Sequence, residues 1–325
     1  MNKVDFFIAG GGIVGATLAL ELRRRFPDLS VILCEKEDRL GAHASTRNSG
    51  VIHSGIYYDP NSVKAKVCHE GAKRMIAFHE ENSLPIRKMG KLLVCPEADM
   101  TDQIDVLYQR AGRNGLNASL IDETTLKEME PEAHSAGGRA IFVPMTAVGD
   151  PAATMQVIEK HLSDYQVKVI TGAGFATRNR DGSIGLSNGE KIAFGYFINA
   201  AGGYADKVAH AFDVGHDYKM LPFRGLYWQL ASDAGIHLNH LVYPVPDLRF
   251  PFLGVHTTTT VDGRIYLGPT ASPGFGREHY RGFAGVNLTD TLNTLLHSGA
   301  QFWGNRNGFR NLAFQEIKRL TKGGF

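Results

Sequence analysis

The sequence predicts an α/β protein in which a parallel sheet flanked by helices is interleaved with a second, mainly antiparallel sheet domain. Three observations predict it. A glycine-rich turn at residues 10–15 stands between a short apolar run and a helical pattern. Further short apolar runs alternate with helical patterns as far as residue 212. From Leu221 onward aromatic and β-branched residues dominate, which is typical of antiparallel strands that cover a site.

The first 35 residues have the element order of a dinucleotide-binding, Rossmann-like unit. Residues 4–9 are apolar apart from Asp5 and favour a strand, and a helix is expected over 16–26 after the glycine turn. A second buried strand is expected over 30–34, and it ends at Glu35. The order strand, glycine turn, helix, strand and acid is the sequence signature of this unit.

Each glycine of the turn has its own physical role in such a unit. Gly10 permits the tight turn, Gly12 lets the backbone approach a pyrophosphate, and Gly15 lets the helix pack closely on the strand. The helix N-terminus offers free N–H groups and a partial positive charge to the phosphates. Glu35 can accept hydrogen bonds from the hydroxyls of a ribose.

Two simpler interpretations of the N-terminus are a secretory signal peptide and an ordinary glycine turn. Asp5 interrupts the basic segment that a signal peptide requires, and no small-residue cleavage site precedes Glu21. Neither alternative explains why a second strand leads to Glu35. The dinucleotide-binding interpretation is therefore preferred.

Composition limits the class of protein. The chain has 325 residues, 43% hydrophobic and 21% charged, with a net charge of +2, which gives no reason to expect nucleic acid as a partner. Cys34, Cys68 and Cys95 are odd in number and widely spaced, which favours a reducing, cytoplasmic compartment. His237 and His240 could share a helix face, but no third ligand follows at a suitable spacing, so no metal site is expected.

The remaining pattern predicts two discontinuous domains. Helices are expected over 64–83, 104–115, 124–129, 151–165 and 205–212, and strands over 91–95, 140–143, 167–170, 196–198 and 257–260. The dinucleotide-binding domain is expected to comprise 1–80 and 148–218, and the substrate domain 81–147 and 219–325.

Seven blocks of sequence carry a family resemblance: 45–58, 64–68, 90–94, 222–227, 241–247, 249–257 and 267–269. They include the runs N-S-G-V-I-H (48–53) and P-F-L-G-V-H (251–256). In these blocks the chain resembles the L-2-hydroxyglutarate oxidase/dehydrogenase family, FAD enzymes of the D-amino-acid-oxidase and glycine-oxidase superfamily.

The resemblance implies FAD as the cofactor. Glu35 is then expected on the adenosine ribose, Ser45, Asn48 and Ser49 along the pyrophosphate and flavin, and the main chain of Phe175 near the adenine. The cofactor-binding residues expected on these grounds are Gly10, Gly12, Ile13, Val14, Gly15, Glu35, Lys36, Ser45, Asn48, Ser49, Gly50, Phe175, Ala201 and Gly202.

Two departures from the family pattern stand out. Thr46 occupies a position where many members have glycine, which raises the question of the φ angle at that turn. Family members also continue for several tens of residues beyond the position of Phe325, with an arginine-containing substrate element and a segment beside the flavin. Because the resemblance implies that this segment contributes to the site, weak catalytic activity is expected of the 325-residue chain.

Oxidation of a 2-hydroxy acid requires a base for the hydroxyl proton and a hydride acceptor, which the flavin supplies. His53 and His256 are the candidate bases, because imidazole titrates near the working pH. His53 is preferred, since it follows the flavin-facing loop by a few residues. The alternative for either histidine is a structural, hydrogen-bonded role.

A dicarboxylate substrate needs donors at both ends. Arg224 is the candidate for a bidentate contact with a carboxylate, and Tyr57, Tyr227 and Tyr243 are candidate hydroxyl donors. The alternative for each tyrosine is packing with a solvated hydroxyl. Arg249 and Arg264, beside turns, are expected on the surface.

The sequence thus predicts FAD-dependent oxidation of L-2-hydroxyglutarate, or a close 2-hydroxy acid, to the 2-oxo acid. One rival is oxidation of a small amine or amino acid, and another is a flavin-binding remnant with little activity. Oxygen, a quinone or another protein would each serve as the electron acceptor. The expected location is the cytoplasm, either free or held peripherally at the inner face of a membrane.

Overall fold

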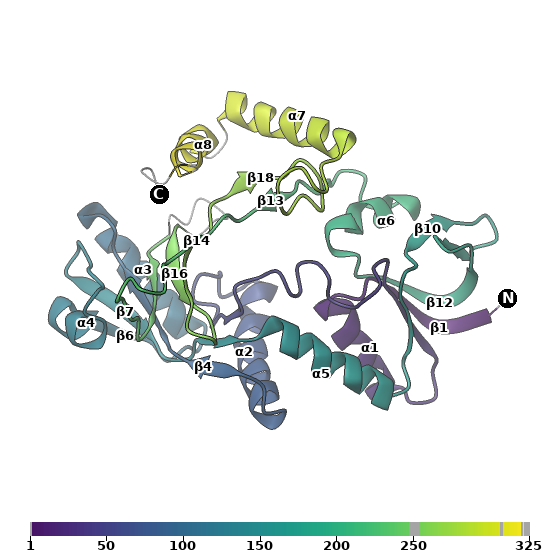
Figure 1. Cartoon of the computed structure of the whole chain (residues 1–325), viewed down its shortest axis with the longest axis horizontal. Helices are drawn as coiled ribbons and strands as arrows, with labels where there is room; N and C mark the ends of the chain where they lie inside the picture. The colour runs from purple at the N-terminus through teal and green to yellow at the C-terminus, as the bar shows by residue number, and fades with distance from the viewer. Residues whose placement is uncertain (1, 247–253, 306–307, 320, 322–325) are drawn as a thin grey trace. The chain divides into compact units, whose positions relative to one another are not determined.

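The computed structural model describes residues 2–246, 254–305, 308–319 and 321 (Figure 1). The chain divides into two compact units, each assembled from separate stretches of sequence. Unit 1 comprises residues 1–48, 151–222 and 274–291, and unit 2 comprises 49–150, 223–273 and 292–325. Asp247, Arg249 and the rest of the stretch 247–253 lie outside the described residues, so the expectation for Arg249 has no structural counterpart.

Unit 1 is built on a six-stranded sheet in the order β10-β11-β12-β1-β2-β9. The strands β12, β1, β2 and β9 are parallel, while β10 and β11 continue the sheet antiparallel at one edge. Their bounds are β1 Asn2–Ala9, β2 Val31–Cys34, β9 Lys168–Ile170, β10 Phe175–Arg178, β11 Ile184–Leu186 and β12 Lys191–Asn199.

The helices of unit 1 are α1 (Ile13–Arg25), α5 (Pro151–Asp164), α6 (Ala205–Ala211) and the short 3₁₀ helix η2 (Gly202–Tyr204). Helices α1 and α5 pack side by side (Figure 1). The sheet is buried on both faces at β1, where the neighbouring residues Phe7 and Ile8 are both fully buried. Burial on both faces is why β2 and the second half of β1, residues 6–9, are continuously apolar rather than alternating.

The described residues of unit 2 form four small sheets with mainly antiparallel pairing. The largest has the order β15-β5-β7-β6, in which only β15 and β5 run parallel. The others have the orders β14-β17-β16, β3-β8-β4 and β13-β18. The bounds are β3 Val51–Ile52, β4 Ile86–Lys88, β5 Lys91–Val94, β6 Ser119–Asp122, β7 Arg139–Val143, β8 Ala147–Gly149, β13 Phe223–Arg224, β14 Trp228–Gln229, β15 Leu241–Pro244, β16 His256–Thr259, β17 Ile265–Gly268 and β18 Ser272–Pro273.

The helices that belong wholly to unit 2 are α2 (Val63–Glu81), η1 (Ala98–Met100), α3 (Thr101–Arg113), α4 (Glu123–Met129) and α8 (Phe309–Lys318), and α7 (Leu288–Gly304) continues into it. Successive side chains of β5 point to opposite faces of the sheet and pack in two different hydrophobic cores. Leu93 packs with Ile141 and Tyr243, whereas Leu92 packs with Leu126 on the other face. Among the described helices, none combines the length and apolarity that crossing a bilayer requires.

The predicted α/β fold class is confirmed, and the predicted helices and strands form close to their expected positions. The division into units differs from the predicted domains. Residues 49–80 belong to unit 2, because β3 pairs with β8 and α2 packs on β3 and β4. Residues 274–291 belong to unit 1. No helix forms at 235–240, so His237 and His240 do not share a helix face.

Candidate functional site

Two of the turn glycines are required by backbone contacts. Gly10 has a φ of +113°, and a Cβ there would lie 2.2 Å from the Ala200 carbonyl oxygen. A Cβ at Gly15 would lie 2.0 Å from the carbonyl oxygen of Gly10, so the first turn of α1 can pack on the loop only without a side chain. Gly12 differs, since only the Ser45 hydroxyl would lie within 4 Å of its Cβ, at 3.0 Å. The space in front of Gly12 is therefore open.

The N-terminus of α1 has the properties of an anion site. Gly12 is the N-cap residue and supplies no side-chain cap, and the first turn carries no acidic residue. The Ile13 N–H donates to the Ser45 hydroxyl at 2.8 Å, and Val14 is 67% exposed. The positive end of the helix dipole is thus uncompensated by any acidic side chain of the helix, which suits a phosphate.

Glu35 is fixed at the end of β2, and the residue is 7% exposed. Its Oε2 accepts a hydrogen bond from the Gly11 N–H at 2.8 Å, and its Oε1 accepts one from the Glu37 N–H at 3.0 Å. Each carboxylate oxygen has a further lone pair. The group is therefore oriented by the backbone and still able to accept from the hydroxyls of a ribose.

The loop after β2 closes through its own side chains. The Thr46 hydroxyl donates to the Gly41 carbonyl at 2.7 Å, and the Asn48 amide donates to the carbonyls of Ala44 and Ser45, both at 3.0 Å. Thr46 is not among the residues with positive φ. The threonine thus fits the turn without backbone strain, and the departure from the family glycine has a local explanation.

The other expected cofactor residues lie on separate segments. The Phe175 ring packs against Phe197 and Phe212 in the core of unit 1, and the residue pairs with Leu186 of β11 at the start of β10. Gly202 has a φ of +53° with open space where a Cβ would be.

Of the fourteen residues expected from the resemblance, all but Ser49 and Gly50 lie in unit 1. The open backbone at Gly12, the N-terminus of α1 with no acidic residue in its first turn, and the oriented carboxylate of Glu35 fit the diphosphate and ribose of FAD.

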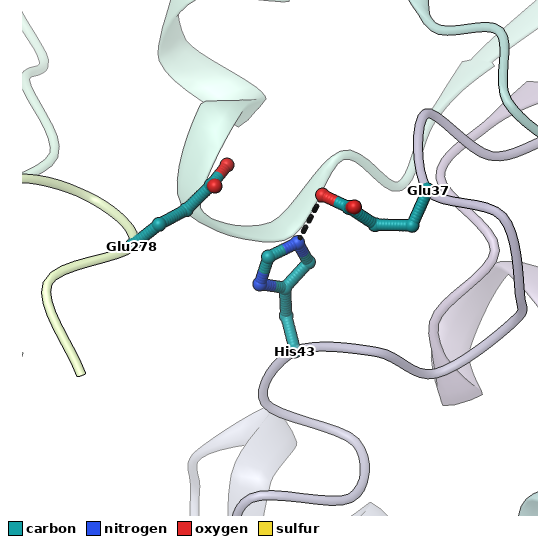
Figure 2. A group of neighbouring side chains, drawn as sticks. All are labelled: Glu37, His43 and Glu278. Atoms are coloured by element: carbon teal, nitrogen blue, oxygen red, sulfur yellow. Dashed lines mark hydrogen bonds and ion pairs between the residues drawn. The ribbon is translucent and has the colours of Figure 1, made fainter. Parts of the chain in front are cut away.

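Unit 1 also contains a cluster of possible metal ligands (Figure 2). One ligand atom each from Glu37, His43 and Glu278 lies within 4.8 Å of the others, and His43 Nε2 is 2.9 Å from Glu37 Oε1. The Lys36 ammonium contacts Glu37, lies 2.6 Å from Glu278 Oε1 and lies 3.0 Å from His43 Nε2. A cationic side chain already stands among the three ligands, so the cluster is an ion-pair network.

Four of the six catalytic candidates come together in unit 2. The His256 ring stacks on Tyr243 with centroids 3.8 Å apart, and the His53 ring meets Tyr243 edge-on at 6.0 Å. Tyr57, the fourth candidate, is linked to Tyr243 through Lys91. The Lys91 Nζ lies 4.5 Å from the ring centroid of Tyr57 and 5.1 Å from that of Tyr243. We call His53, Tyr57, Lys91, Tyr243 and His256 the unit 2 cluster.

Burial controls the charge of this cluster. Together with the smaller effect of the neighbouring Lys91 charge, it lowers the pKa of His53 to about 3 and that of His256 to about 4. Both imidazoles are therefore neutral at pH 7. Burial also raises the pKa of Tyr57 and of Tyr243, so both phenols are protonated.

The two histidines differ in their hydrogen bonds. His256 Nδ1 lies 2.8 Å from the Gly254 carbonyl oxygen. A carbonyl only accepts, so Nδ1 carries the hydrogen and Nε2 is left as an acceptor. His53 Nδ1 is buried and has no hydrogen-bond partner among the described residues.

The remaining two candidates, Arg224 and Tyr227, lie on β13 and on the segment that follows it. Arg224 lies on β13, opposite Ser272 of β18. Tyr227 is 42% exposed and meets Tyr266 edge-on with ring centroids 6.2 Å apart. Arg264 pairs with Asp262 on the surface, as expected.

Lys91 is the residue that sequence reasoning missed. It is fully buried, although a lysine that opens an apolar strand is expected at the surface. The only available signal was the position of Lys91 inside the Gly90–Val94 block, directly before three apolar residues.

The family of the chain follows from its similarity to known proteins. The family model for FAD dependent oxidoreductases (DAO) matches residues 5–313. The chain belongs to this DAO family. FAD is therefore its cofactor, as the resemblance predicted, and the chain is an oxidoreductase.

Curated relatives of the chain include L-2-hydroxyglutarate dehydrogenases. The mitochondrial enzyme of Caenorhabditis elegans is 38% identical over 93% of this chain and 71% of its own length. That of Mus musculus is 37% identical over 95% of this chain and 67% of its own. The enzyme of Indibacter alkaliphilus is 38% identical over 92% of this chain and 75% of its own.

Solved structures of other proteins share the fold. The L-α-glycerophosphate oxidase of Mycoplasma pneumoniae with FAD bound has a TM-score of 0.73 and 26% identity, covering 86% of this chain and 74% of that one. Glycine oxidase from Geobacillus kaustophilus has a TM-score of 0.73 at 18% identity, covering 92% of this chain and 78% of that one. The second likeness concerns the fold alone.

Proposed function

We propose that the chain oxidises L-2-hydroxyglutarate, or a close 2-hydroxy acid, to the corresponding 2-oxo acid with FAD as the oxidant. The observation that carries the proposal is the similarity of 36–38% to curated L-2-hydroxyglutarate dehydrogenases over more than nine tenths of the chain. The unit 2 cluster supports it, because buried hydroxyl and nitrogen donors suit a substrate with two carboxylates.

Unit 1 is proposed to hold the cofactor. The N–H groups at the start of α1 receive the pyrophosphate, and the backbone of Gly12 allows its close approach. Glu35 accepts from the adenosine ribose, and Ser45 and Asn48 line the phosphates. Bound FAD supplies the hydride acceptor of the reaction.

The proposed base is His53. Its ring is neutral at pH 7, which is the form that accepts a proton, and its Nδ1 has no partner among the described residues. A substrate carboxylate bound in the cluster would raise the pKa of His53 above about 3 and so strengthen the base. His256 is the alternative, since its Nε2 is the acceptor nitrogen of a ring fixed by Gly254.

Hydroxyl groups and a guanidinium are proposed to orient the substrate. Tyr57 and Tyr243 keep their protons because burial raises the pKa of each, so both are donors. Arg224 has the planar fork that binds a carboxylate bidentately, and Tyr227 is a further donor on the same chain segment.

Anaerobic titration of the FAD-loaded protein tests the function. L-2-hydroxyglutarate is expected to bleach the flavin absorbance, while D-2-hydroxyglutarate, glycine and L-proline leave it unchanged. Bleaching by an amino acid but not by L-2-hydroxyglutarate would assign the chain to amine oxidation instead. An FAD-loaded protein that no candidate reduces would support the flavin-binding remnant.

The location and the electron acceptor complete the proposal. All three cysteines are free, which fits a reducing compartment such as the cytoplasm, with or without peripheral contact to a membrane. Several relatives are named as mitochondrial enzymes. Oxygen or a quinone is proposed to reoxidise the flavin, and comparing turnover with each acceptor decides between them.

A further inference from the structure

The position of Lys91 in the sheet explains its burial. Strand β5 begins at Lys91 and lies between β15 and β7, so the residue is flanked by Leu241 on one side and Val143 on the other. Alternation directs its side chain to the same face as Leu93, which packs in the larger core of unit 2. The preceding residue, Gly90, has a φ of +67°, a left-handed conformation that glycine adopts readily where the chain turns into the strand.

No described group balances a charge on Lys91. Its Nζ is buried and has no hydrogen-bond partner among the described residues. The groups that face it are the His53 and His256 rings, the Tyr57 and Tyr243 phenols and the Cys68 thiol of α2. The facing set therefore includes no carboxylate.

A buried ammonium group with no carboxylate beside it is energetically unfavourable unless an anion binds next to it. Two aromatic faces compensate part of the lost hydration through cation–π contacts. Burial still lowers the pKa of Lys91 to about 7, against a usual 10.5. Because an unpaired buried charge is costly, a cluster that contains an ammonium and phenol donors but no acid is complementary to an anion.

We infer that Lys91 binds a carboxylate of the substrate and positions it within the unit 2 cluster. The inference rests on the proposed function, since that function supplies a substrate with two carboxylates. Three N–H donors on the ammonium and the Tyr57 hydroxyl would then gain the acceptor that the described residues do not provide.

Binding of an unreactive dicarboxylate tests this role without turnover. Glutarate lacks the 2-hydroxyl group, and its binding to the FAD-loaded protein is followed by the shift of the flavin spectrum or by calorimetry. Lys91→Met keeps an unbranched side chain of similar length but removes the donor. We expect its Kd for glutarate to rise about 10- to 100-fold, the loss typical of a charge-assisted hydrogen bond.

The matched control is Lys88→Met, at the end of the neighbouring strand β4. Lys88 pairs with Glu80 at the surface, with 58% of its side chain exposed, so its removal is expected to leave the Kd unchanged. An unchanged Kd in Lys91→Met with slowed flavin reduction would overturn the inference and make the neutral amine the proton acceptor of the reaction.

Proton uptake tests the role in the unaltered protein, should Lys91→Met fail to fold. At pH 8 free Lys91 is mostly neutral, because its pKa is about 7. A carboxylate favours the ammonium, so glutarate binding is expected to take up close to one proton, measured by calorimetry in two buffers of different ionisation enthalpy. Binding without uptake would contradict the inference.

The two hypotheses fail in different ways. The proposed function fails if L-2-hydroxyglutarate does not reduce the flavin, whatever the behaviour of glutarate. The role of Lys91 fails if glutarate binding is independent of the Lys91 charge, or if glutarate does not bind at all between pH 6 and 8, even when the flavin is reduced normally.

Discussion

At the scale of single residues, Gly12 and Gly15 differ in what an added side chain would meet. Gly15 faces the Gly10 carbonyl oxygen, whereas Gly12 faces open space and the movable hydroxyl of Ser45. We therefore expect Gly12→Leu to fold and to lose FAD, because the side chain fills the path of the pyrophosphate. Gly15→Val is expected to destabilise the protein itself. Flavin absorbance after gel filtration and the thermal midpoint separate the two effects, and full FAD retention by a folded Gly12→Leu would disprove this assignment.

A second residue-scale prediction concerns His53. If it is the base, His53→Asn slows anaerobic flavin reduction by roughly two to four orders of magnitude, since a positioned base contributes about that much. FAD stays bound, because the expected cofactor residues are separate from His53. The control is His134→Asn, whose side chain is 70% exposed beside Glu123. Stopped-flow reduction at a near-normal rate would move the role to His256.

Burial of His53 and His256 also predicts acid sensitivity. Their pKa values of about 3 and about 4 in the fold lie below the usual 6.5. Below pH 6.5 the unfolded chain therefore binds protons that the folded protein does not, and stability falls as the pH falls towards 4. Urea unfolding at pH 7 and pH 5 measures the loss, which we expect to be smaller in His256→Gln. An equal loss in both proteins would contradict the prediction.

At the scale of elements, ion pairs attach the segment 274–291 to α6, and the more buried of them joins Arg277 to Asp206. Arg277 contacts Asp206, and its Nε lies 3.4 Å from Asp290, with Arg277 and Asp206 each under a tenth exposed. Burial acts to raise the pKa of Asp206, but hydrogen bonds from Arg277 and from the backbone N–H groups of Met220 and Lys207, with the Arg277 charge, together hold it far below its usual range. The segment brings Glu278 to Lys36 and Tyr204, so the pair also organises the network around the loop after β2.

Breaking this pair on one side should be costly. Arg277→Met leaves Asp206 buried without its partner, and we expect a loss of about 3–5 kcal/mol in the free energy of unfolding. Arg264→Met, which removes an exposed pair with Asp262, is the control and is expected to change little. Equal unfolding midpoints for the two variants would show that Arg277 contributes no more than a surface charge.

At the scale of the whole molecule, ligand binding is coupled to folding. FAD binds only the folded protein, so it stabilises that state by an amount that grows with its concentration, about 2.7 kcal/mol at one hundred times the Kd. A rising thermal midpoint with added FAD is expected for the wild type and not for Gly12→Leu. NADH is expected to give no rise, because the family cofactor is FAD. A larger rise with NADH would contradict the cofactor assignment.

The division into two units was only partly predictable from the sequence. The predicted boundaries near residues 150 and 220 agree with the ends of unit 1 segments, because changes in hydrophobic pattern mark them. Residues 49–80 were expected with the dinucleotide-binding domain, yet β3 pairs with β8 and α2 packs beside it. Pairing between strands about 100 residues apart has no local signature.

The sequence by itself determined the family, the cofactor and the first nucleotide-binding unit. The glycine turn and Glu35 are local devices, in which spacing along the chain fixes the geometry. The sequence also indicated four catalytic candidates in separate blocks of resemblance: His53, Tyr57, Tyr243 and His256. Only the tertiary structure brought these four around one point and placed Lys91 among them. The reason is physical: the burial of a lysine depends on which strands flank it, and that is decided by long-range pairing on both sides of β5.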